Sequence, residues 1–240
     1  MQIALIGDIH GNLPALEAVL EDAGSVGVET VWNMGDMVGY GAYSDEVVTR
    51  LRLEKVLSIL GNYDRKTLRF KKRSKKWKKK KRREKWLAFK DAYESLSEEN
   101  LSYLKLLPKK RNMTVCGHRF LLCHGSPDSI KECLEEETSD ARWRGLSATC
   151  DADVVVCAHS HRALLKQVNG VWFVNTGTVG RPVDGDPRAC YCLAEVEKGF
   201  FRAEHRRIEY DTEQAAEAIL SKGLPPVFAQ MIREGVDLPN

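Results

Sequence analysis

Seven polar side chains in this sequence directly follow short apolar runs, where they could bind metal ions. They are Asp8, His10, Asp36, Asn62, His124, His159 and His161. All seven are nitrogen or oxygen donors and none is a cysteine, a choice that suits two divalent ions of borderline softness. The sequence therefore predicts a site that binds two metal ions.

The spacing within two of these motifs indicates shared ligation. In DIH, Asp8 and His10 are two residues apart, so the period of a strand would point both side chains to one side as the strand ends. The pair in AHSH, His159 and His161, repeats this spacing and could serve one ion or be divided between two. Asp8 could instead cap a helix starting near Leu13. The order of all seven donors after successive strands favours metal binding.

The first half of the chain alternates between strand and helix patterns. Apolar runs at residues 2–7, 30–34 and 56–60 predict strands, and residues 14–24 and 44–56 predict helices. Such alternation is typical of parallel strands joined by crossover helices. The loops that carry Asp or Asn would then lie at the carboxyl ends of the strands, where open α/β sheets bind ligands.

The second half of the chain has a different pattern. Residues 65–107 are expected to be mostly helical, and strands follow from about residue 112. Asn169-Gly170 suits a type I′ turn between two strands, and residues 188–210 predict another hairpin. Two helices are expected at Thr212–Lys222 and Pro226–Glu234. We interpret residues 1–240 as one domain.

Composition limits the location of the protein. The seven cysteines are odd in number and form no C-x-x-C pair, which favours a reducing compartment. We find no leader pattern, and no apolar run approaches the roughly 18 residues of a membrane span. We therefore expect a soluble, cytoplasmic protein with no membrane partner.

Positive charge is concentrated in one segment. Arg65 to Lys85 contains 15 Lys or Arg residues and one acid, which leaves 22 of the 37 bases and 33 of the 34 acids for the rest of the chain. We treat residues 65–95 as a basic helical insert. It is either a solvated helix face or a mobile arm that gathers RNA or another polyanion, with Trp77 available for base stacking.

The motifs, taken in order, resemble those of the calcineurin-like metallophosphoesterases, in particular their small prokaryotic phosphodiesterase branch. The matching stretches are DIH, GD, GNYD, HG, AHSH and NTGTVGRPVDGDPRACY. The resemblance implies an α/β fold of two facing mixed β-sheets flanked by helices, a four-layer α/β/β/α sandwich.

The resemblance also implies a division of the seven donors. One ion would be held by Asp8, His10 and His161, a second by Asn62, His124 and His159, and Asp36 would bridge them. The ions would be Mn, Fe, Zn or Ni. Two dications with two carboxylates leave a net charge of +2, which attracts phosphate and lowers the pKa of a bridging water.

Tyr63 occupies the position where many phosphatases of this family carry a histidine near the leaving group. A phenol with a pKa near ~10 is neutral at pH 7, although its hydroxyl can donate a hydrogen bond. We therefore predict a phosphodiesterase in which a metal-bridging hydroxide attacks phosphorus and substrates with stable leaving groups are preferred. Tyr63 and Asp64 are the candidate catalytic pair, with Asp64 orienting the Tyr63 loop.

Substrate contacts are less sharply predicted. Asn12 could reach a phosphate or cap the first helix, and Arg65 and Arg181 could pair with phosphate oxygens or be solvated surface residues. Two other functions stay open: a non-catalytic scaffold of the same fold, and a nucleic-acid-binding protein that acts through the insert. The sequence does not indicate the substrate or the oligomeric state.

Overall fold

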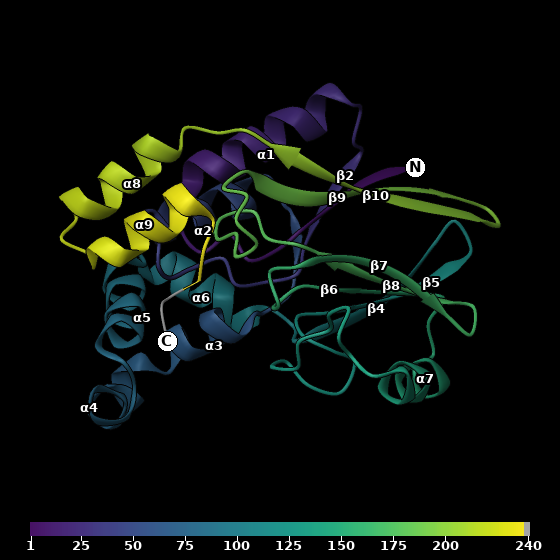
Figure 1. Ribbon diagram of the computed structural model, residues 1–240, viewed down its shortest axis with the longest axis horizontal. Helices are drawn as coiled ribbons and strands as arrows, with labels where there is room; N and C mark the ends of the chain where they lie inside the picture. Colours follow the sequence, from purple (N-terminus) through teal and green to yellow (C-terminus); the bar gives the residue numbers. More distant parts are fainter. Residues whose placement is uncertain (238–240) are drawn as a thin grey trace.

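The computed structural model describes residues 1–237 and contains two β-sheets that face each other (Figure 1). The first sheet contains β1 (Gln2–Ile6), β2 (Thr30–Asn33), β3 (Leu57–Ser58), β9 (Ala189–Glu197) and β10 (Phe200–Ile208). The second contains β4 (Lys110–Val115), β5 (His118–Cys123), β6 (Val154–Cys157), β7 (Ala163–Val168) and β8 (Val171–Thr176). Their strand orders are β10-β9-β1-β2-β3 and β4-β5-β6-β8-β7.

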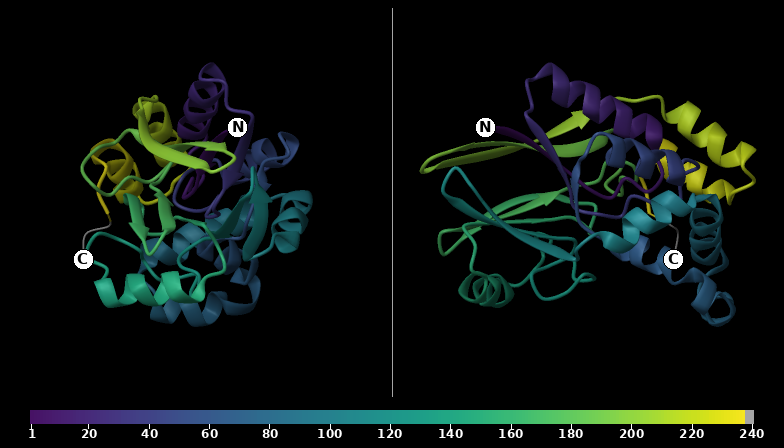
Figure 2. Two further views of the ribbon diagram at one scale, coloured as in Figure 1. Left: turned by 90° about the vertical axis from the view of Figure 1, so that its right-hand side faces the viewer. Right: turned by 180° about the vertical axis from the view of Figure 1, so that it is seen from behind.

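Helices cover the outer faces and one end of this pair of sheets. Their bounds are α1 (Leu13–Ser25), α2 (Ser44–Leu53), α3 (Asn62–Leu68), α4 (Phe70–Lys80), α5 (Arg83–Ser95), α6 (Glu98–Leu106), α7 (Asp140–Thr149), α8 (Thr212–Ser221) and α9 (Pro226–Glu234). Figure 2 shows α1 above the first sheet and α7 below the second. The predicted layers are confirmed.

Each sheet mixes parallel and antiparallel strands. In the first, β1, β2 and β3 are parallel, and β9 and β10 join them as antiparallel neighbours. In the second, β5, β6 and β8 are parallel, while β4 and β7 are antiparallel edge strands. The predicted metal donors all follow strands that have a parallel neighbour, namely β1, β2, β3, β5 and β6.

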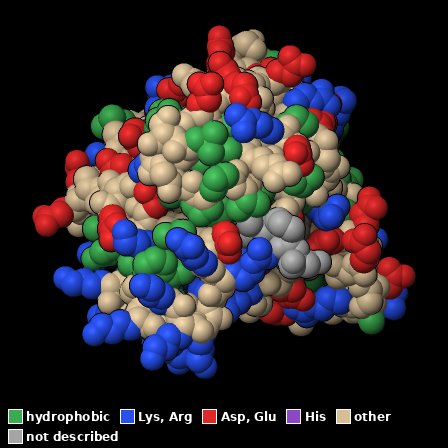
Figure 3. Space-filling model, turned by 60° about the vertical axis from the view of Figure 1, so that its left-hand side comes forward, with side chains coloured by type: hydrophobic (Ala, Val, Ile, Leu, Met, Phe, Trp, Pro, Cys, Tyr) green, Lys and Arg blue, Asp and Glu red, His purple; other side chains and the backbone are tan. Residues whose placement is uncertain are grey.

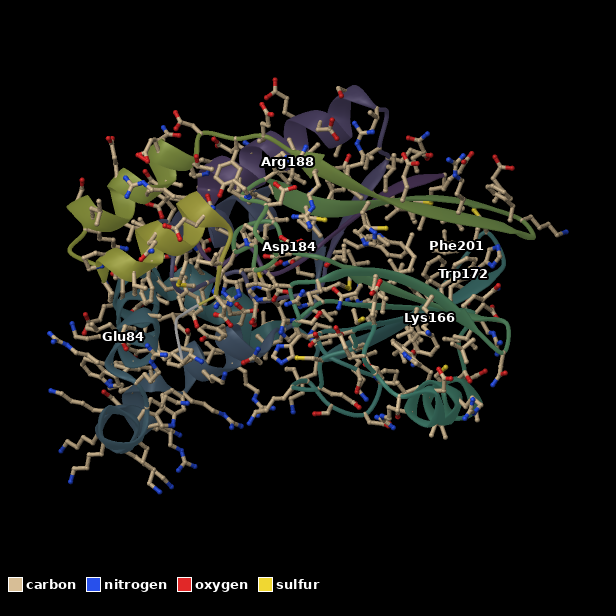
Figure 4. All side chains as sticks on the ribbon, viewed as in Figure 1. Glu84, Lys166, Trp172, Asp184, Arg188 and Phe201 are labelled. Carbon is tan, nitrogen blue, oxygen red and sulfur yellow. The ribbon has the colours of Figure 1, made fainter. Side chains whose placement is uncertain are left out.

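Alternation along the strands builds the core. Ile3 and Leu5 of β1 point between the sheets and pack in one cluster with Phe120 of β5. Ala4 and Ile6, on the other face of β1, pack against α1 and α2. At the far end, Figure 4 shows Phe201 and Trp172 between the two sheets, and their ring centroids are 5.9 Å apart. The outer face of the second sheet packs on α7.

Local signals in the sequence have the expected structural effects. Asn12 is the N-cap of α1, and its side chain accepts a hydrogen bond from Ala15 N. Asn169 and Gly170 have φ values of 50° and 82°, as a type I′ turn between β7 and β8 requires. Strand β3 is shorter than expected: it includes only Leu57 and Ser58 of the predicted residues 56–60.

The basic insert does not extend as an arm, as the sequence suggested, but folds back on the body. Phe70 is buried, and its ring lies 5.8 Å from those of Trp86 and Tyr93 on α5. The Trp77 ring packs 5.5 Å from Phe89. Aromatic contacts therefore hold α4 against α5 as a helical hairpin. Among the helices within residues 1–237, none is long and apolar enough to cross a membrane.

Candidate metal centre

The seven predicted donors meet at one edge of the two sheets. They are carried by the segments that follow β1, β2, β3, β5 and β6, all members of parallel pairs. The carboxyl ends of parallel strands share one edge, so donors from distant parts of the sequence converge. Six of the seven side chains are buried and His159 is half-buried.

Two groups of three side chains have the spacing of metal ligands. They are Asp8, His10 and His161, and Asp36, His124 and His159; within each group, one ligand atom per residue lies within 4.8 Å of the others. Asp36 lies between the groups, because its Oδ2 is 3.3 Å from His124 Nε2 and 3.9 Å from His10 Nε2. This arrangement suits a carboxylate shared by two ions.

Asn62 joins the second group through its amide. Its Nδ2 lies 3.1 Å from Asp36 Oδ2, 3.2 Å from His124 Nε2 and 2.9 Å from His159 Nδ1. The amide oxygen accepts a hydrogen bond from Lys66 Nζ. To bind an ion, Asn62 must turn its oxygen toward the group, and the two orientations of an amide differ only in hydrogen bonding.

The backbone around the donors is unusual. Asp8, His10, Asp36, His159 and His161 all have φ values between 50° and 72°. This left-handed region costs non-glycine residues about 1–3 kcal/mol each, and such residues cluster at functional sites. The expectation that Asp8 and His10 share a side through strand alternation is therefore wrong, since β1 ends at Ile6. Asp8 does not cap α1 either.

Hydrogen bonds between the loops maintain this conformation. The buried Asp64 carboxylate accepts backbone N–H groups of Gly61, Asp36 and Met37, each at 2.9 Å. Asp36 Oδ1 in turn accepts the Tyr63 N–H at 2.6 Å. A Cβ atom on Gly61 would lie 2.1 Å from the Asp36 nitrogen, so only glycine allows this close approach. Asp64 thus positions the loops that carry the donors.

Three of the histidines have a fixed orientation. The Nδ1 atoms of His10, His124 and His161 lie 3.3, 2.8 and 2.7 Å from backbone carbonyl oxygens of Val38, Met34 and Arg181. An Nδ1–H that donates to a carbonyl leaves Nε2 as the acceptor, and here Nε2 faces the centre. Burial lowers the pKa of His10 to about 3 and holds that of His161 well below its usual value, so both rings are neutral.

Several donor atoms face each other or have no hydrogen-bond partner, an arrangement that a metal ion would stabilise. Asp8 Oδ1 is buried and has no hydrogen-bond partner, which is costly for a carboxylate oxygen. His10 Nε2 and His161 Nε2 are 3.2 Å apart, with two acceptor lone pairs facing each other. A cation between these atoms would satisfy all three.

The electrostatics of the second group also favour a cation. Burial lowers the pKa of His124, but the Asp36 and Asp8 carboxylates outweigh it and raise the pKa to about 9. Burial raises the pKa of Asp8 to about 8. Asp36 thus attracts positive charge strongly enough to hold a proton on a buried imidazole, and a cation nearby would favour the charged form of Asp8.

Comparison with known proteins agrees with this site. Residues 1–199 match the calcineurin-like phosphoesterase superfamily domain. The chain belongs to that superfamily. An uncharacterized protein of Methanocaldococcus jannaschii is 32% identical over 249 residues, covering 93% of each chain. A metallophosphoesterase structure from Sphaerobacter thermophilus has 27% identity and a TM-score of 0.78, covering 98% of this chain and 99% of the other.

The fold extends to a more distant relative. A hypothetical protein of Pyrococcus horikoshii has 21% identity and a TM-score of 0.87, and the match covers 99% of both chains. The superfamily expected from the motifs is confirmed by the match of residues 1–199, and the layered fold is confirmed over nearly the whole chain.

A pocket of about 260 Å³ opens beside the centre of this superfamily member. Its lining includes Asp36, Asn62, His159 and His161 together with Tyr63. The Tyr63 side chain is 9% exposed, and its hydroxyl forms a short hydrogen bond with that of Tyr40. Burial, aided by Tyr40, raises the pKa of Tyr63 well above its usual value, so the phenol stays neutral.

Two arginines differ in their position relative to the pocket. Arg181, for which both a phosphate contact and a solvated surface position were open, has a side chain only 11% exposed and lines the pocket. Its guanidinium lies 4.5 Å from the Tyr40 ring centroid, and its buried Nε has no hydrogen-bond partner. Arg65 is half-buried and does not line the pocket, whereas its neighbour Lys66 does.

The amide nitrogen and oxygen of the Asn12 side chain both form hydrogen bonds within the fold. Its amide nitrogen donates to Gly180 O and Tyr210 Oη, each at 3.1 Å, while its oxygen caps α1. The capping alternative therefore describes Asn12, and it does not line the pocket. The sequence did not single out Lys66, although its position four residues after Asn62 on α3 puts both on one helix face.

Proposed function

We propose that this protein is a phosphodiesterase that uses two divalent metal ions. One observation carries the proposal: seven donors from five loops converge on a buried site, in which one carboxylate oxygen lacks any partner. Phosphoester hydrolysis needs positive charge beside the phosphate, and two ions about 3.5–4 Å apart commonly supply it. Asp36 Oδ2 lies 3.9 Å from His10 Nε2 of one group and 3.3 Å from His124 Nε2 of the other, so one carboxylate is within reach of both ions.

Each donor has a proposed place. Asp8, His10 and His161 hold one ion, Asn62, His124 and His159 hold the other, and Asp36 contacts both; Mn, Fe, Zn and Ni all suit this set. When bound, the ions would activate water and neutralise phosphate charge. The hydrogen bonds of the imidazole Nδ1 atoms keep the opposite nitrogens aimed at the ions.

The surroundings of the phosphate favour substrates that need no strong acid. Tyr63 keeps its proton and shares it with Tyr40, so it can donate at most a neutral hydrogen bond. The Asp64 oxygens are occupied by backbone N–H groups. Diesters with stable leaving groups should therefore react faster than alkyl monoesters. Arg181 would contact the oxygens of the reacting phosphate, and Lys66 would contact the substrate beside it; Asn12 and Arg65 do not line the pocket.

The test combines metal analysis with a substrate pair. Purified protein is loaded with Mn²⁺ and assayed with bis(4-nitrophenyl) phosphate and 4-nitrophenyl phosphate, before and after chelation. We expect two ions per chain, faster diester hydrolysis, loss of activity with chelator and its return with metal. Metal binding without hydrolysis of either compound would instead favour the scaffold alternative.

The outward face of α4 favours a second role, the gathering of RNA or a similar polyanion. Lys72, Lys75, Lys76 and Lys79 recur at helical spacing and are all exposed, opposite the face that packs through Trp77. Figure 3 shows Lys and Arg side chains gathered at the lower left of the molecule, the end where α4 lies in Figure 1. Glu84, labelled in Figure 4, is the single acid of residues 65–85. Closely spaced lysines of this kind attract phosphate chains.

A further inference from the structure

The inward side of the basic hairpin contributes charge to the pocket itself. Lys81 and Lys85 line the pocket together with Lys66 and Arg181, directly beside the metal donors. Lys81 directly follows the end of α4 in an extended conformation, and its backbone N–H donates to Trp77 O at 2.9 Å. The fold of the hairpin therefore divides its bases between an outer surface and the wall of the pocket.

Aromatic rings support two of these lysines without neutralising them. Lys66 Nζ lies 4.7 Å from the Tyr63 ring centroid, and Lys81 Nζ lies 5.5 Å from that of Trp77 and 5.8 Å from that of Phe89. Such contacts orient an ammonium group but leave its N–H donors available.

The two carboxylates in the pocket lining, Asp36 and Asp237, have other partners, the Tyr63 N–H and Arg181. Within residues 1–237, neither Lys66, Lys81 nor Lys85 forms an ion pair with a carboxylate. Burial and the charges of Lys85 and Lys131 lower the pKa of Lys81. Like charges gathered in this way repel one another, and a bound anion would relieve that repulsion.

We propose that Lys66, Lys81 and Lys85 bind a phosphate adjacent to the one that is hydrolysed, so that the substrate is a phosphoanhydride, a small molecule with two linked phosphates. This inference rests on the proposed function, because it assigns the leaving group of the same site. One phosphate lies at the metal donors, and the lysines hold the next.

The chemistry explains why such a leaving group fits. The oxygen of water bonds to phosphorus, the bond from phosphorus to the bridging oxygen breaks, and the electron pair stays on the departing phosphate. The water proton passes to solvent. A departing phosphate carries its charge without a proton from the protein, and three ammonium groups stabilise that charge. Neither Tyr63 nor Asp64 is free to act as a strong acid there.

The size of the pocket favours a compact anion over a nucleic-acid strand. Its volume of about 260 Å³ lies below the roughly 300–1,000 Å³ of typical small-molecule sites. A diphosphate group fits such a space, whereas a strand would extend along an open surface such as the outer face of α4.

Equilibrium binding tests the lysines without turnover. Calorimetry compares methylenediphosphonate, a diphosphate analogue whose bridging carbon prevents hydrolysis, with inorganic phosphate for Mn²⁺-loaded wild-type protein, for Lys81→Gln/Lys85→Gln, and for Lys105→Gln/Lys109→Gln as a control. The control removes the same charge at two exposed positions outside the pocket. We expect wild type to prefer the diphosphate analogue, and the pocket variant to lose about tenfold in affinity for the analogue for each lysine removed. The control should match wild type.

Hydrolysis and charge rescue complete the test. The ratio of kcat/KM for diadenosine diphosphate to that for bis(4-nitrophenyl) phosphate should fall in Lys81→Gln/Lys85→Gln and recover in Lys81→Arg/Lys85→Arg. Equal losses of affinity for the diphosphate analogue in the pocket variant and the control would overturn the inference, as would no preference for the analogue in wild type. Absence of any Mn²⁺-dependent hydrolysis contradicts the proposed function instead, while the binding comparison still decides the role of the lysines.

Discussion

Two regions with opposite properties border one pocket. The metal centre is buried, and almost every donor atom is fixed by a named partner, such as the carbonyl oxygens that orient His124 and His161. The basic hairpin is exposed, and most of its charges lack an acidic partner within the described chain. In the metal centre, the choice of ion depends on where each donor atom lies. In the basic hairpin, attraction of anions depends on the total positive charge of many side chains.

This difference predicts how each region responds to mutation. A single substitution in the centre removes a ligand that no neighbour can replace. A single substitution in the hairpin removes one of many similar charges, so effects there should be small and roughly additive.

The largest expected effect belongs to the centre. Asp36→Asn keeps an oxygen that can accept the Tyr63 N–H, so the fold should persist, but it removes the charge shared by both groups. Loss of groups that merely orient metal ligands costs about 10–100-fold in activity or metal affinity. We therefore expect Asp36→Asn to lose more than about a hundredfold in diester hydrolysis and to bind fewer than two ions, by metal analysis.

The control for this substitution is a carboxylate outside the centre. Asp153→Asn removes the surface partner of Arg119 and should retain both ions and full activity. Full activity of Asp36→Asn in metal-free form would contradict a metal-dependent mechanism.

The sequence predicted the centre well because its information is local. Each donor directly follows a strand, and parallel strands bring such positions together without further instruction. What it could not predict depends on contacts between distant residues. The return of α4 requires Trp77 to meet Phe89, and the burial of Arg181 requires the Tyr40 ring. Neither partner is visible in a charge pattern.

Backbone conformation was likewise hidden. The left-handed φ values at Asp8 and His10 depend on hydrogen bonds to Gly35 and Asp36, which follow a different strand. A strand-like D-x-H pattern therefore predicted two side chains that do lie together, but for the wrong geometric reason. Lys66 was missed because a lysine among fifteen bases gives no distinct signal.

A second prediction concerns the outer face of the hairpin. Replacing Lys72, Lys75, Lys76 and Lys79 by Gln should weaken binding of a single-stranded RNA and flatten its salt dependence by about 0.7 for each lysine that neutralises a phosphate. Diester hydrolysis should persist, because none of the four lines the pocket. Fluorescence titration between low and moderate salt measures the slope. These substitutions spare Trp77, whereas a deletion of α4 would remove its contact with Phe89.

The comparison with Lys105→Gln/Lys109→Gln makes this result specific, since that variant also loses positive surface charge. If all three proteins share one RNA affinity and one salt slope, the outer face is simply a solvated helix.

A third prediction concerns Tyr63, which lines the pocket between the metal centre and the basic hairpin. Tyr63→His should raise the ratio of monoester to diester hydrolysis, because an imidazole can protonate a poor leaving group. We expect about tenfold or less, below the ~10²–10⁴-fold of a tuned acid, since Asp64 is already bound to backbone and cannot tune the new ring. Steady-state rates on bis(4-nitrophenyl) phosphate and on an alkyl monoester such as glycerol phosphate give the ratio, and an unchanged ratio would exclude a leaving-group role for this position.

The smallest expected effect comes from an ion pair outside both regions, which sets the scale for an ordinary charge contact. Asp22 accepts hydrogen bonds from Arg206 and Tyr191, and those from Arg206 lower its pKa. A folded pKa below the unfolded value stabilises the protein above about pH 4, and this stabilisation is lost as pH falls through the folded pKa. Asp22→Asn should therefore lower the free energy of unfolding by about 1 kcal/mol at pH 7 and by less at pH 3, in urea titrations. An equal difference at both pH values would show that packing, rather than charge, makes Asp22 stabilising.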